Sequence, residues 1–391
     1  MKTLRDIELT GKRVLVRVDF NVPMNEAGEI TDDLRIRTVL PTLRYLLEQK
    51  ARVIVCTHMG RPKGQRVEKY SLAPAAAYLA NLLGQPVPLA PDCIGPEVAA
   101  AVAALQDGQI LMLENLRFHP EEEKNDPEFS RQLASVADVY VNDAFAVSHR
   151  AHASVVGVTL HVREKAAGFL LQKEVEYFHR SIDAPQRPLV AIVGGAKVSG
   201  KLEALRNMLG RVDKMIIGGA MANTFLKSQG YGVGASKVED DLLTTADALL
   251  RQAREKNIKV YLPVDVIVAD RFAPDAVCKQ VTVQDIPDNW MALDIGPASV
   301  VCFNEVLADA KTIVWNGPMG AFEMDAFARG TMAMAHTVAA SHALSVTGGG
   351  DSNAAIAQSG EADNISYMST GGGAFLEMME GKILPGVKAL D

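Results

Sequence analysis

Isolated arginines and a histidine follow strand-like runs in the first 150 residues, whereas glycine-rich loops crowd the rest of the chain. Of the 31 glycines, 9 precede residue 190 and 22 follow it. Arginine binds a small phosphate or carboxylate with a fixed fork of donors, whereas glycine lets backbone N–H groups approach a polyphosphate closely. The two halves of the chain therefore predict binding of two different anions.

The arginine-bearing segments of the first half each follow a predicted strand. They are RVDFNVP (17–23), THMGRP (57–62), ENLRF (114–118) and the run 142–152. Ligands of open α/β sheets bind beyond the carboxyl ends of the strands, so we expect one basic pocket, which Arg35 can join. Taken singly, such an arginine is usually a surface salt bridge, Asp19 and Asn21 could close a turn, and His58 could be a packed loop histidine. Their recurrence at successive strand ends favours a site.

In the second half, the loop GGAKVSGK (194–201) follows the apolar run Leu189–Val193. Residues 195–201 fit the first seven positions of GxxxxGK[ST], but Leu202 replaces the hydroxyl with which a P-loop binds magnesium. The loop predicts a phosphate cradle without full P-loop geometry, and Lys197 and Lys201 are its phosphate-binding candidates. A tight strand-to-helix connection without a ligand remains the alternative.

Four more glycine-bearing loops follow in the second half, namely 218–220, 315–323, 347–352 and 369–374. A helix N-terminus behind such a loop favours an anion through its exposed N–H groups and the helix dipole. Asp351 offers an oxygen ligand for magnesium beside phosphates, or it simply caps a helix. Glu323 could bind ribose hydroxyls or lie in a solvated turn.

Strands and helices alternate in both halves, which predicts parallel sheets covered by helices. In the first half we expect strands at Arg13–Val18, Arg52–Thr57, Ile110–Leu113 and Asp138–Val141, and helices at Ile36–Gln49, Leu72–Leu83 and Glu97–Leu105. In the second half we expect strands, buried on both faces, at Leu189–Val193, Lys214–Ile217, Lys259–Leu262, Thr312–Trp315 and Ala343–Val346.

A chain of 391 residues exceeds the size of a single hydrophobic core, so two domains with a ligand cleft between them are expected. The segment Gly168–Ile182 has helical spacing and ends at a proline-bearing stretch, which predicts a connecting helix and a boundary near residue 180. The fold class is α/β, with two doubly wound parallel-sheet, Rossmann-like domains.

Composition predicts a soluble globular enzyme, with 48% hydrophobic and 22% charged residues. A net charge of −7 argues against a nucleic-acid-binding protein, and neither a secretory signal nor a membrane-spanning run is visible. The cysteines are Cys56, Cys93, Cys278 and Cys302. Because they lack metal-binding spacing, we expect buried, reduced thiols in a cytoplasmic protein.

Eight strings together resemble the phosphoglycerate kinase family: RVDFNVP, THMGRP, ENLRF, HRAHAS, GGAKVSGK, WNGPMGAFE, GGGDS and STGGGAFLE. They occur in the family's order between about Arg13 and Pro385. Ser352 and Ala321 stand where many members carry threonine and valine, which are small departures. The resemblance implies a glycolytic kinase that moves a phosphoryl group reversibly from 1,3-bisphosphoglycerate to ADP, giving 3-phosphoglycerate and ATP with Mg²⁺.

The resemblance also implies the site residues. For the acid substrate these are Asp19, Phe20, Asn21, Arg35, His58, Met59, Gly60, Arg61, Arg117 and Arg150. For the nucleotide they are Lys197, Lys201, Gly218, Asn316, Glu323, Gly349, Gly350, Asp351 and Ser352, with Asp351 also toward magnesium. The catalytic group is Arg35, Lys201, Gly371 and Gly372.

The resemblance further implies an acid-binding domain over 1–180, to which residues 374–391 return, a nucleotide-binding domain over 181–373, and a monomer. Transfer would be direct and in line after hinge closure. A P-loop NTPase and a non-catalytic nucleotide sensor are the alternatives. A nicotinamide dehydrogenase is weaker, because no GxGxxG follows an early strand.

Overall fold

The computed structural model describes residues 1–391, which form two compact units. One unit comprises residues 1–175 and 383–391, and the other comprises residues 176–382. The division falls within α6 (Phe169–Phe178), which a π-helical turn, His179–Asp183, extends. These two elements occupy the segment in which the sequence predicts a connecting helix.

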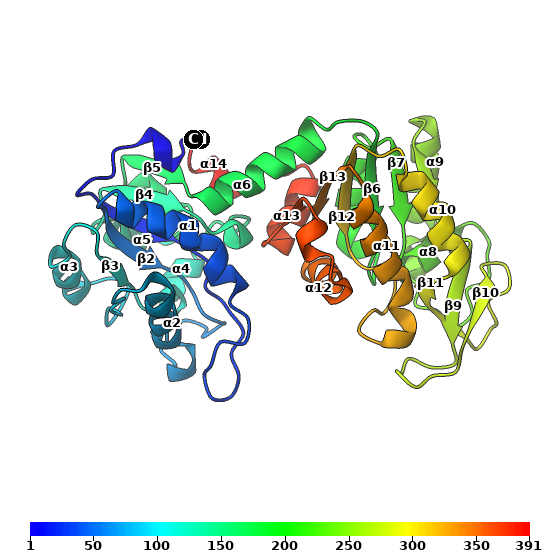
Figure 1. Cartoon of the computed structure of the whole chain (residues 1–391), viewed down its shortest axis with the longest axis horizontal. Helices are drawn as coiled ribbons and strands as arrows, with labels where there is room; N and C mark the ends of the chain where they lie inside the picture. The colour runs from blue at the N-terminus through cyan, green and yellow to red at the C-terminus, as the bar shows by residue number, and fades with distance from the viewer. The chain divides into compact units, whose positions relative to one another are not determined.

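The first unit is built on a five-stranded parallel sheet of order β3-β2-β1-β4-β5 (Figure 1). Its strands are β1 (Arg13–Arg17), β2 (Arg52–Cys56), β3 (Ile110–Met112), β4 (Val139–Asn142) and β5 (Glu164–Ala167). Its helices are α1 (Leu34–Glu48), α2 (Ala73–Leu83), α3 (Pro96–Ala103), α4 (Pro120–Glu123), α5 (Pro127–Ala134) and α14 (Pro385–Lys388). Val14 and Val53 pack with α1 and α2 on one face, while Leu15 and Ile54 are fully buried on the other. Both faces are therefore covered, as the continuous apolar strands predict.

The second unit holds a six-stranded parallel sheet of order β14-β13-β12-β6-β7-β8 and a smaller antiparallel sheet of order β10-β9-β11. The large sheet comprises β6 (Leu189–Val193), β7 (Lys214–Ile217), β8 (Lys259–Tyr261), β12 (Thr312–Asn316), β13 (Leu344–Thr347) and β14 (Tyr367–Met368). The small sheet comprises β9 (Asp265–Ala269), β10 (Cys278–Thr282) and β11 (Met291–Ile295). The helices are α7 (Leu202–Met208), α8 (Met221–Ser228), α9 (Leu243–Glu255), α10 (Pro297–Leu307), α11 (Arg329–Ala340), α12 (Gly350–Ser359) and α13 (Gly372–Met379).

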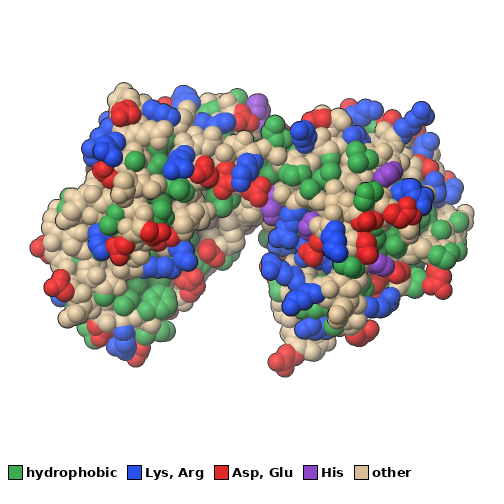
Figure 2. Space-filling view, turned by 180° about the vertical axis from the view of Figure 1, so that it is seen from behind, with side chains coloured by type: hydrophobic (Ala, Val, Ile, Leu, Met, Phe, Trp, Pro, Cys, Tyr) green, Lys and Arg blue, Asp and Glu red, His purple; other side chains and the backbone are tan.

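Short 3-10 helices lie in the connections of both units. They are Leu4–Asp6, Glu68–Tyr70, Leu116–Phe118, Phe145–Val147, Gly157–Leu160, Ser199–Lys201, Asp240–Leu242, Asp325–Phe327 and Ala362–Asn364. The chain contains no helix that is both long and apolar enough to span a bilayer. On the face shown in Figure 2, positive and negative side chains are mixed over most of the surface, and Lys and Arg side chains gather beside His side chains on the left flank of the right-hand unit.

The α/β class with two doubly wound parallel-sheet domains is confirmed. The sequence does not predict β5, β14 or the antiparallel sheet. Two of the four residues of β5 are charged, β14 has two residues, and β10 is largely exposed, so none is a long apolar run. Their strand state depends on neighbours that supply hydrogen bonds, which periodicity does not reveal.

The observed units differ from the predicted domain limits at two places. The first unit ends at residue 175 rather than 180, and the returning segment begins at 383 rather than 374. The second difference arises because α13 packs on α7, where Asn207 Nδ2 donates to the Met379 carbonyl oxygen at 2.6 Å.

The cysteine expectation is wrong in one respect. All four thiols are free, but only Cys56 and Cys93 are buried, whereas Cys278 and Cys302 are exposed.

Candidate functional site

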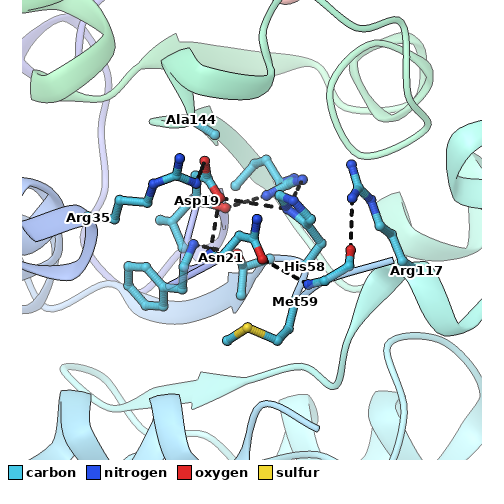
Figure 3. A network of polar contacts seen from close by, with 12 residues as sticks. Asp19, Asn21, Arg35, His58, Met59, Arg117 and Ala144 are labelled. Carbon is cyan, nitrogen blue, oxygen red and sulfur yellow. Dashed lines mark hydrogen bonds and ion pairs between the residues drawn. The ribbon is translucent and has the colours of Figure 1, made fainter. Parts of the chain in front are cut away.

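The predicted acid-binding residues of the first unit lie on loops at the carboxyl edge of its sheet. Arg17, the last residue of β1, pairs in register with Cys56 of β2 and Asn142 of β4, so the loops that follow begin side by side. From the start of α1, Arg35 donates through Nη1 to Asp19 Oδ2 at 2.7 Å (Figure 3). The ion pair joins the first loop to the first helix.

Hydrogen bonds extend this pair into a connected set. Asp19 Oδ1 accepts from the Asn21 backbone N–H at 3.1 Å, and Asn21 Oδ1 accepts from the Gly60 N–H at 2.8 Å. The Gly60 carbonyl oxygen in turn accepts from Arg117 Nη1 at 2.9 Å (Figure 3). Five predicted residues from three different loops and a helix thus lie together.

The electrostatics of this set favour an anion. Burial lowers the pKa of Arg117 from its usual value, and the charges of Arg17 and Arg150 lower it further. Glu123 opposes this shift, with its Oε1 3.4 Å from Arg117 Nε. Burial first, and then the arginines nearby, lower the pKa of His152 to about 3. Arg17, Arg117 and Arg150 therefore repel one another in this cluster, and an incoming anion would relieve that repulsion.

Other predicted residues stand apart from this set. The side chains of Phe20 and Met59 belong to the hydrophobic core, at 0% and 2% exposure, so only their backbones are available to a ligand. Arg61 is exposed and makes no hydrogen bond or ion pair within the chain. Arg150 is half-buried, with Nε 3.3 Å from His149 Nε2.

In the second unit, the glycine loops after β6, β7 and β12 touch one another through their backbones. A Cβ on Gly317, at φ +97°, would lie 2.2 Å from the Gly194 carbonyl oxygen, and one on Gly219 would lie 2.5 Å from the Gly195 nitrogen. Lys201 Nζ donates to the carbonyl oxygens of Gly194 at 2.6 Å and Asn316 at 2.9 Å. Glycine is required here because any side chain would separate the loops.

We predict that Gly317→Ala destabilises the second unit by more than about 2 kcal/mol, because it adds a backbone clash to the strain of a positive φ. Gly230→Ala is the matched control, since Gly230 has φ +91° but open space around a Cβ. It should cost about 1–2 kcal/mol from backbone strain alone. Chemical denaturation of both variants checks this, and equal losses would contradict the contact argument.

The remaining glycine loops meet behind the first three. Ser352 is fully buried, and its hydroxyl accepts from the Gly317 N–H at 2.6 Å. Asn316 Nδ2 donates to the Gly348 carbonyl oxygen at 2.7 Å, and a Cβ on Gly372 would lie 3.0 Å from the Gly349 Cα. The side chains of Ser352 and Asn316 thus hold the loops in place. Gly218 lies against Met319, with no room for a Cβ.

A cavity of about 480 Å³ opens beside these loops. Glu323 and Asp351 line it together with Gly195, as do three residues that the sequence analysis did not select as site residues, Phe272, Met291 and Leu293. The latter lie on or near the unpredicted antiparallel sheet, which is why sequence patterns missed them. A second hollow, of about 510 Å³ beside α9 and β8, contains no predicted site residue.

One group of side chains could hold a metal ion by composition: Asp92, Cys93 and His119 place their ligand atoms within 4.8 Å of one another. Asp92 Oδ1 and His119 Nε2, however, are already paired at 2.7 Å. Burial raises the pKa of the Cys93 thiol well above its usual value, which keeps it protonated. The group is an ion pair beside a buried thiol.

Asp351, the predicted magnesium ligand, is exposed in the first turn of α12.

The chain matches the family model described as phosphoglycerate kinase over residues 4–382. The chain belongs to the phosphoglycerate kinase family. It is 70% identical over 391 residues to the phosphoglycerate kinase of Desulfotalea psychrophila, with 100% of both chains covered. It is 58% identical over 384 residues to that of Pelobacter propionicus, covering 98% of this chain and 96% of the relative.

Solved phosphoglycerate kinase structures have the same fold as this chain. The structure from Coxiella burnetii has a TM-score of 0.92 at 45% identity, covering 99% of this chain and 98% of the other. The structure from Pyrococcus horikoshii OT3 has a TM-score of 0.86 at 35% identity, covering 100% and 98%. The protein is accordingly a phosphotransferase, a nucleotide-binding glycolytic kinase of this family. The family decides against a P-loop NTPase and a nucleotide sensor.

Sequence reasoning also missed the buried residues behind the arginine set. Arg17, Glu122 and Ser154 are all fully buried and joined by hydrogen bonds. Arg17 was visible as a charge at the end of an apolar strand, but nothing in the sequence placed Glu122 and Ser154 near it. Another missed residue is Glu239, whose Oε2 accepts from the Val198 N–H at 2.6 Å and so binds the glycine loop of 194–201.

Proposed function

We propose that the first unit binds 3-phosphoglycerate or 1,3-bisphosphoglycerate, and that the second unit binds ADP or ATP with Mg²⁺. The observation that carries the proposal is the connected set at the carboxyl edge of the first sheet, from Arg35 through Asp19, Asn21 and Gly60 to Arg117. A small acid with two anionic groups matches its excess of fixed donors. Phe20 and Met59 contribute through their backbones, and His58, Arg61 and Arg150 complete the acid site.

The nucleotide site is assigned to the glycine loops and the cavity beside them. Lys197 and Lys201 bind phosphates, Glu323 binds the ribose, and Gly349 and Gly350 offer N–H groups at the start of α12. Gly218, Asn316 and Ser352 support these loops from within. The assignment is consistent with the cavity, which Glu323 and Asp351 both line.

Asp351 fits a role as magnesium ligand. Its carboxylate is exposed toward the cavity and makes no hydrogen bond or ion pair within the chain, so its oxygens are available. Magnesium is commonly held by one or two carboxylates together with substrate phosphates. When bound, the ion would neutralise part of the phosphate charge, and Asp351 would supply one oxygen.

We assign the phosphoryl transfer to a direct in-line reaction. Arg35 and Lys201 hold the transferring group and balance its negative charge, and the backbone N–H groups of Gly371 and Gly372 add donors near the start of α13. Because the acid and nucleotide residues belong to separate units, the reaction requires hinge closure that unites both ligands and excludes water.

The first test measures ADP formation from Mg-ATP with and without 3-phosphoglycerate, using a coupled assay that removes the acyl phosphate product. Formation that depends strictly on the acid supports the assignment. Equal ADP release without the acid, or no turnover with either mixture, would contradict the assignment of the acid site.

We predict that both ligands together compact the protein more than either ligand alone. Closure is stabilised only when both domains contribute contacts to the ligands. Small-angle X-ray scattering of the free, acid-bound, nucleotide-bound and doubly bound protein checks this. Equal radii of gyration in all four states would contradict hinge closure.

We further propose a cytoplasmic monomer without nucleic-acid or membrane partners. The net charge of −7 and four cysteines without a disulfide support this proposal. Sedimentation velocity at several protein concentrations checks the oligomeric state.

A further inference from the structure

A buried cation lies directly behind the acid site. Arg17 is 0% exposed, and all three of its guanidinium nitrogens have partners. Nε donates to Ser154 Oγ at 2.8 Å, Nη1 donates to the Val18 carbonyl oxygen, and Nη2 lies 3.2 Å from His58 Nδ1. The guanidinium therefore has a single fixed orientation, with one fork directed at the histidine.

The charge of Arg17 has a buried counterpart. The Ser154 hydroxyl donates to Glu122 Oε1 at 2.6 Å, and the Ser154 N–H donates to Oε2 at 2.9 Å. Glu122 is 0% exposed. A hydroxyl thus links a buried carboxylate to a buried guanidinium, which holds the guanidinium where no water can replace its partners.

This contact indicates which His58 nitrogen carries the proton. A guanidinium has only donors, so the ring nitrogen facing it must offer a lone pair. That nitrogen is Nδ1; Asp19 Oδ1, the other group near it, lies farther away, at 3.8 Å. A neutral ring then carries its hydrogen on Nε2. A second proton on Nδ1 would place an N–H donor and a positive charge against the guanidinium, which would repel it.

The surroundings also keep His58 neutral. Burial, followed by the charges of Arg17, Arg117, Arg35 and His152, lowers its pKa well below the usual value. His58 Nε2 makes no hydrogen bond within the chain, and it is not completely buried. Although His58 is only 3% exposed, Nε2 is therefore the ring atom that a ligand can reach.

We propose that Arg17 is a positioning residue that fixes His58 as the Nε2–H tautomer, so that His58 presents a hydrogen-bond donor to an anionic oxygen of the acid substrate. The substrate part of this inference rests on the proposed function, whereas the tautomer does not. His58 then binds the acid without acting as a proton acceptor, in keeping with a phosphoryl transfer that needs little proton chemistry from the protein.

The test is ¹⁵N NMR of the histidine rings in the full-length, ligand-free protein. The chain has 8 histidines, and the spectrum of His58→Gln assigns the signal. We expect a non-protonated Nδ1 and a protonated Nε2 for His58 at every pH from about 5.5 to 8. A protonated Nδ1, or an imidazolium forming within that range, would overturn the proposal.

Two variants test whether Arg17 is the cause. Arg17→Gln can offer either an oxygen or an N–H to Nδ1, so it should produce a mixture of tautomers and raise the KM for 3-phosphoglycerate about tenfold, with a smaller change in kcat. The double variant Arg17→Gln/Glu122→Gln should show the same tautomer mixture and the same rise in KM. It also removes the buried Glu122 carboxylate that Arg17→Gln leaves without a cation, so it is less prone to unfold. Arg13→Gln is the matched control, because Arg13 lies on the same strand and pairs with Asp138.

The outcomes separate the two proposals. A folded Arg17 variant with an unchanged His58 tautomer would overturn the positioning role, whatever the enzyme activity. If neither variant folds, a protonated Nδ1 in the wild-type protein still overturns the proposal, and a non-protonated Nδ1 supports it. A confirmed Nε2–H tautomer in a protein whose ADP formation does not depend on the acid would support the positioning role and refute the proposed substrate.

Discussion

We expect Arg35→Ala to lower kcat by about a hundredfold or more, because in the proposed mechanism it removes a preorganised cation from the transferring phosphoryl group. One such donor contributes about 3–4 kcal/mol of transition-state stabilisation. Arg35 suits this role since Asp19 holds its Nη1 at 2.7 Å while 39% of the side chain remains exposed to a ligand. Steady-state kinetics with saturating 3-phosphoglycerate and Mg-ATP measure the effect.

The control for this prediction lies two residues away on the same helix. Arg37 is exposed and pairs with Asp33, so Arg37→Ala should leave kcat within about twofold. Thermal unfolding of both variants separates catalysis from stability, because Arg35→Ala also leaves Asp19 without its ion pair. A near-normal kcat in Arg35→Ala would show that this arginine does not balance the transferring charge.

We expect Lys201→Met to produce a loss of similar size, a hundredfold or more in kcat, if Lys201 balances the transferring charge as proposed. The ammonium is held by the carbonyl oxygens of Gly194 and Asn316, so it is oriented before the nucleotide arrives. Lys227→Met is the matched control, because Lys227 lies on α8 and pairs at the surface with Asp240. If Lys201→Met kept most of its kcat while only the KM for ATP rose, Lys201 would bind the nucleotide without stabilising the transition state.

The pH dependence of Lys201 gives an independent check. Burial lowers its pKa to about 8, and the charge of Asp351 partly opposes the shift. The lysine is therefore charged below pH 8 and loses its charge as pH rises through that value. We expect kcat/KM for ATP, which reports the free enzyme, to fall between about pH 7.5 and 9. Lys201→Met should lack this step, and an identical step in the variant would assign it to another group.

Most residues proposed for the acid site could be selected from the sequence because they are arginines, a histidine or short polar residues in loops that follow apolar runs. Parallel strands carry their carboxyl ends to one edge, so position along the chain already implies proximity in space. The glycine loops could be selected for a similar reason, because glycines recur directly after apolar runs. The structure explains this recurrence, since a Cβ at Gly317 or Gly219 has no room. The sequence did not indicate that Phe20 and Met59 would have their side chains in the core.

The cavity beside the glycine loops was only half predictable from the sequence. Glu323 and Asp351 stand beside glycine motifs, whereas Phe272 and Met291 come from a segment without strong periodicity. The antiparallel strands β9, β10 and β11 form because each supplies hydrogen bonds to a neighbour, and the exposed β10 has no buried face to record in its sequence.

The α/β class, the parallel sheets and the loops that carry the arginines and glycines could be inferred from the residues alone, because apolar runs and glycine positions are local properties of the chain. Which buried groups meet depends on the folded chain. Arg17, Ser154 and Glu122 lie far apart in the chain and touch because β1 ends where two later segments pack. The protonation of His58 follows from that meeting, since a hydrogen-bond partner is chosen by distance in space and not by spacing in the sequence.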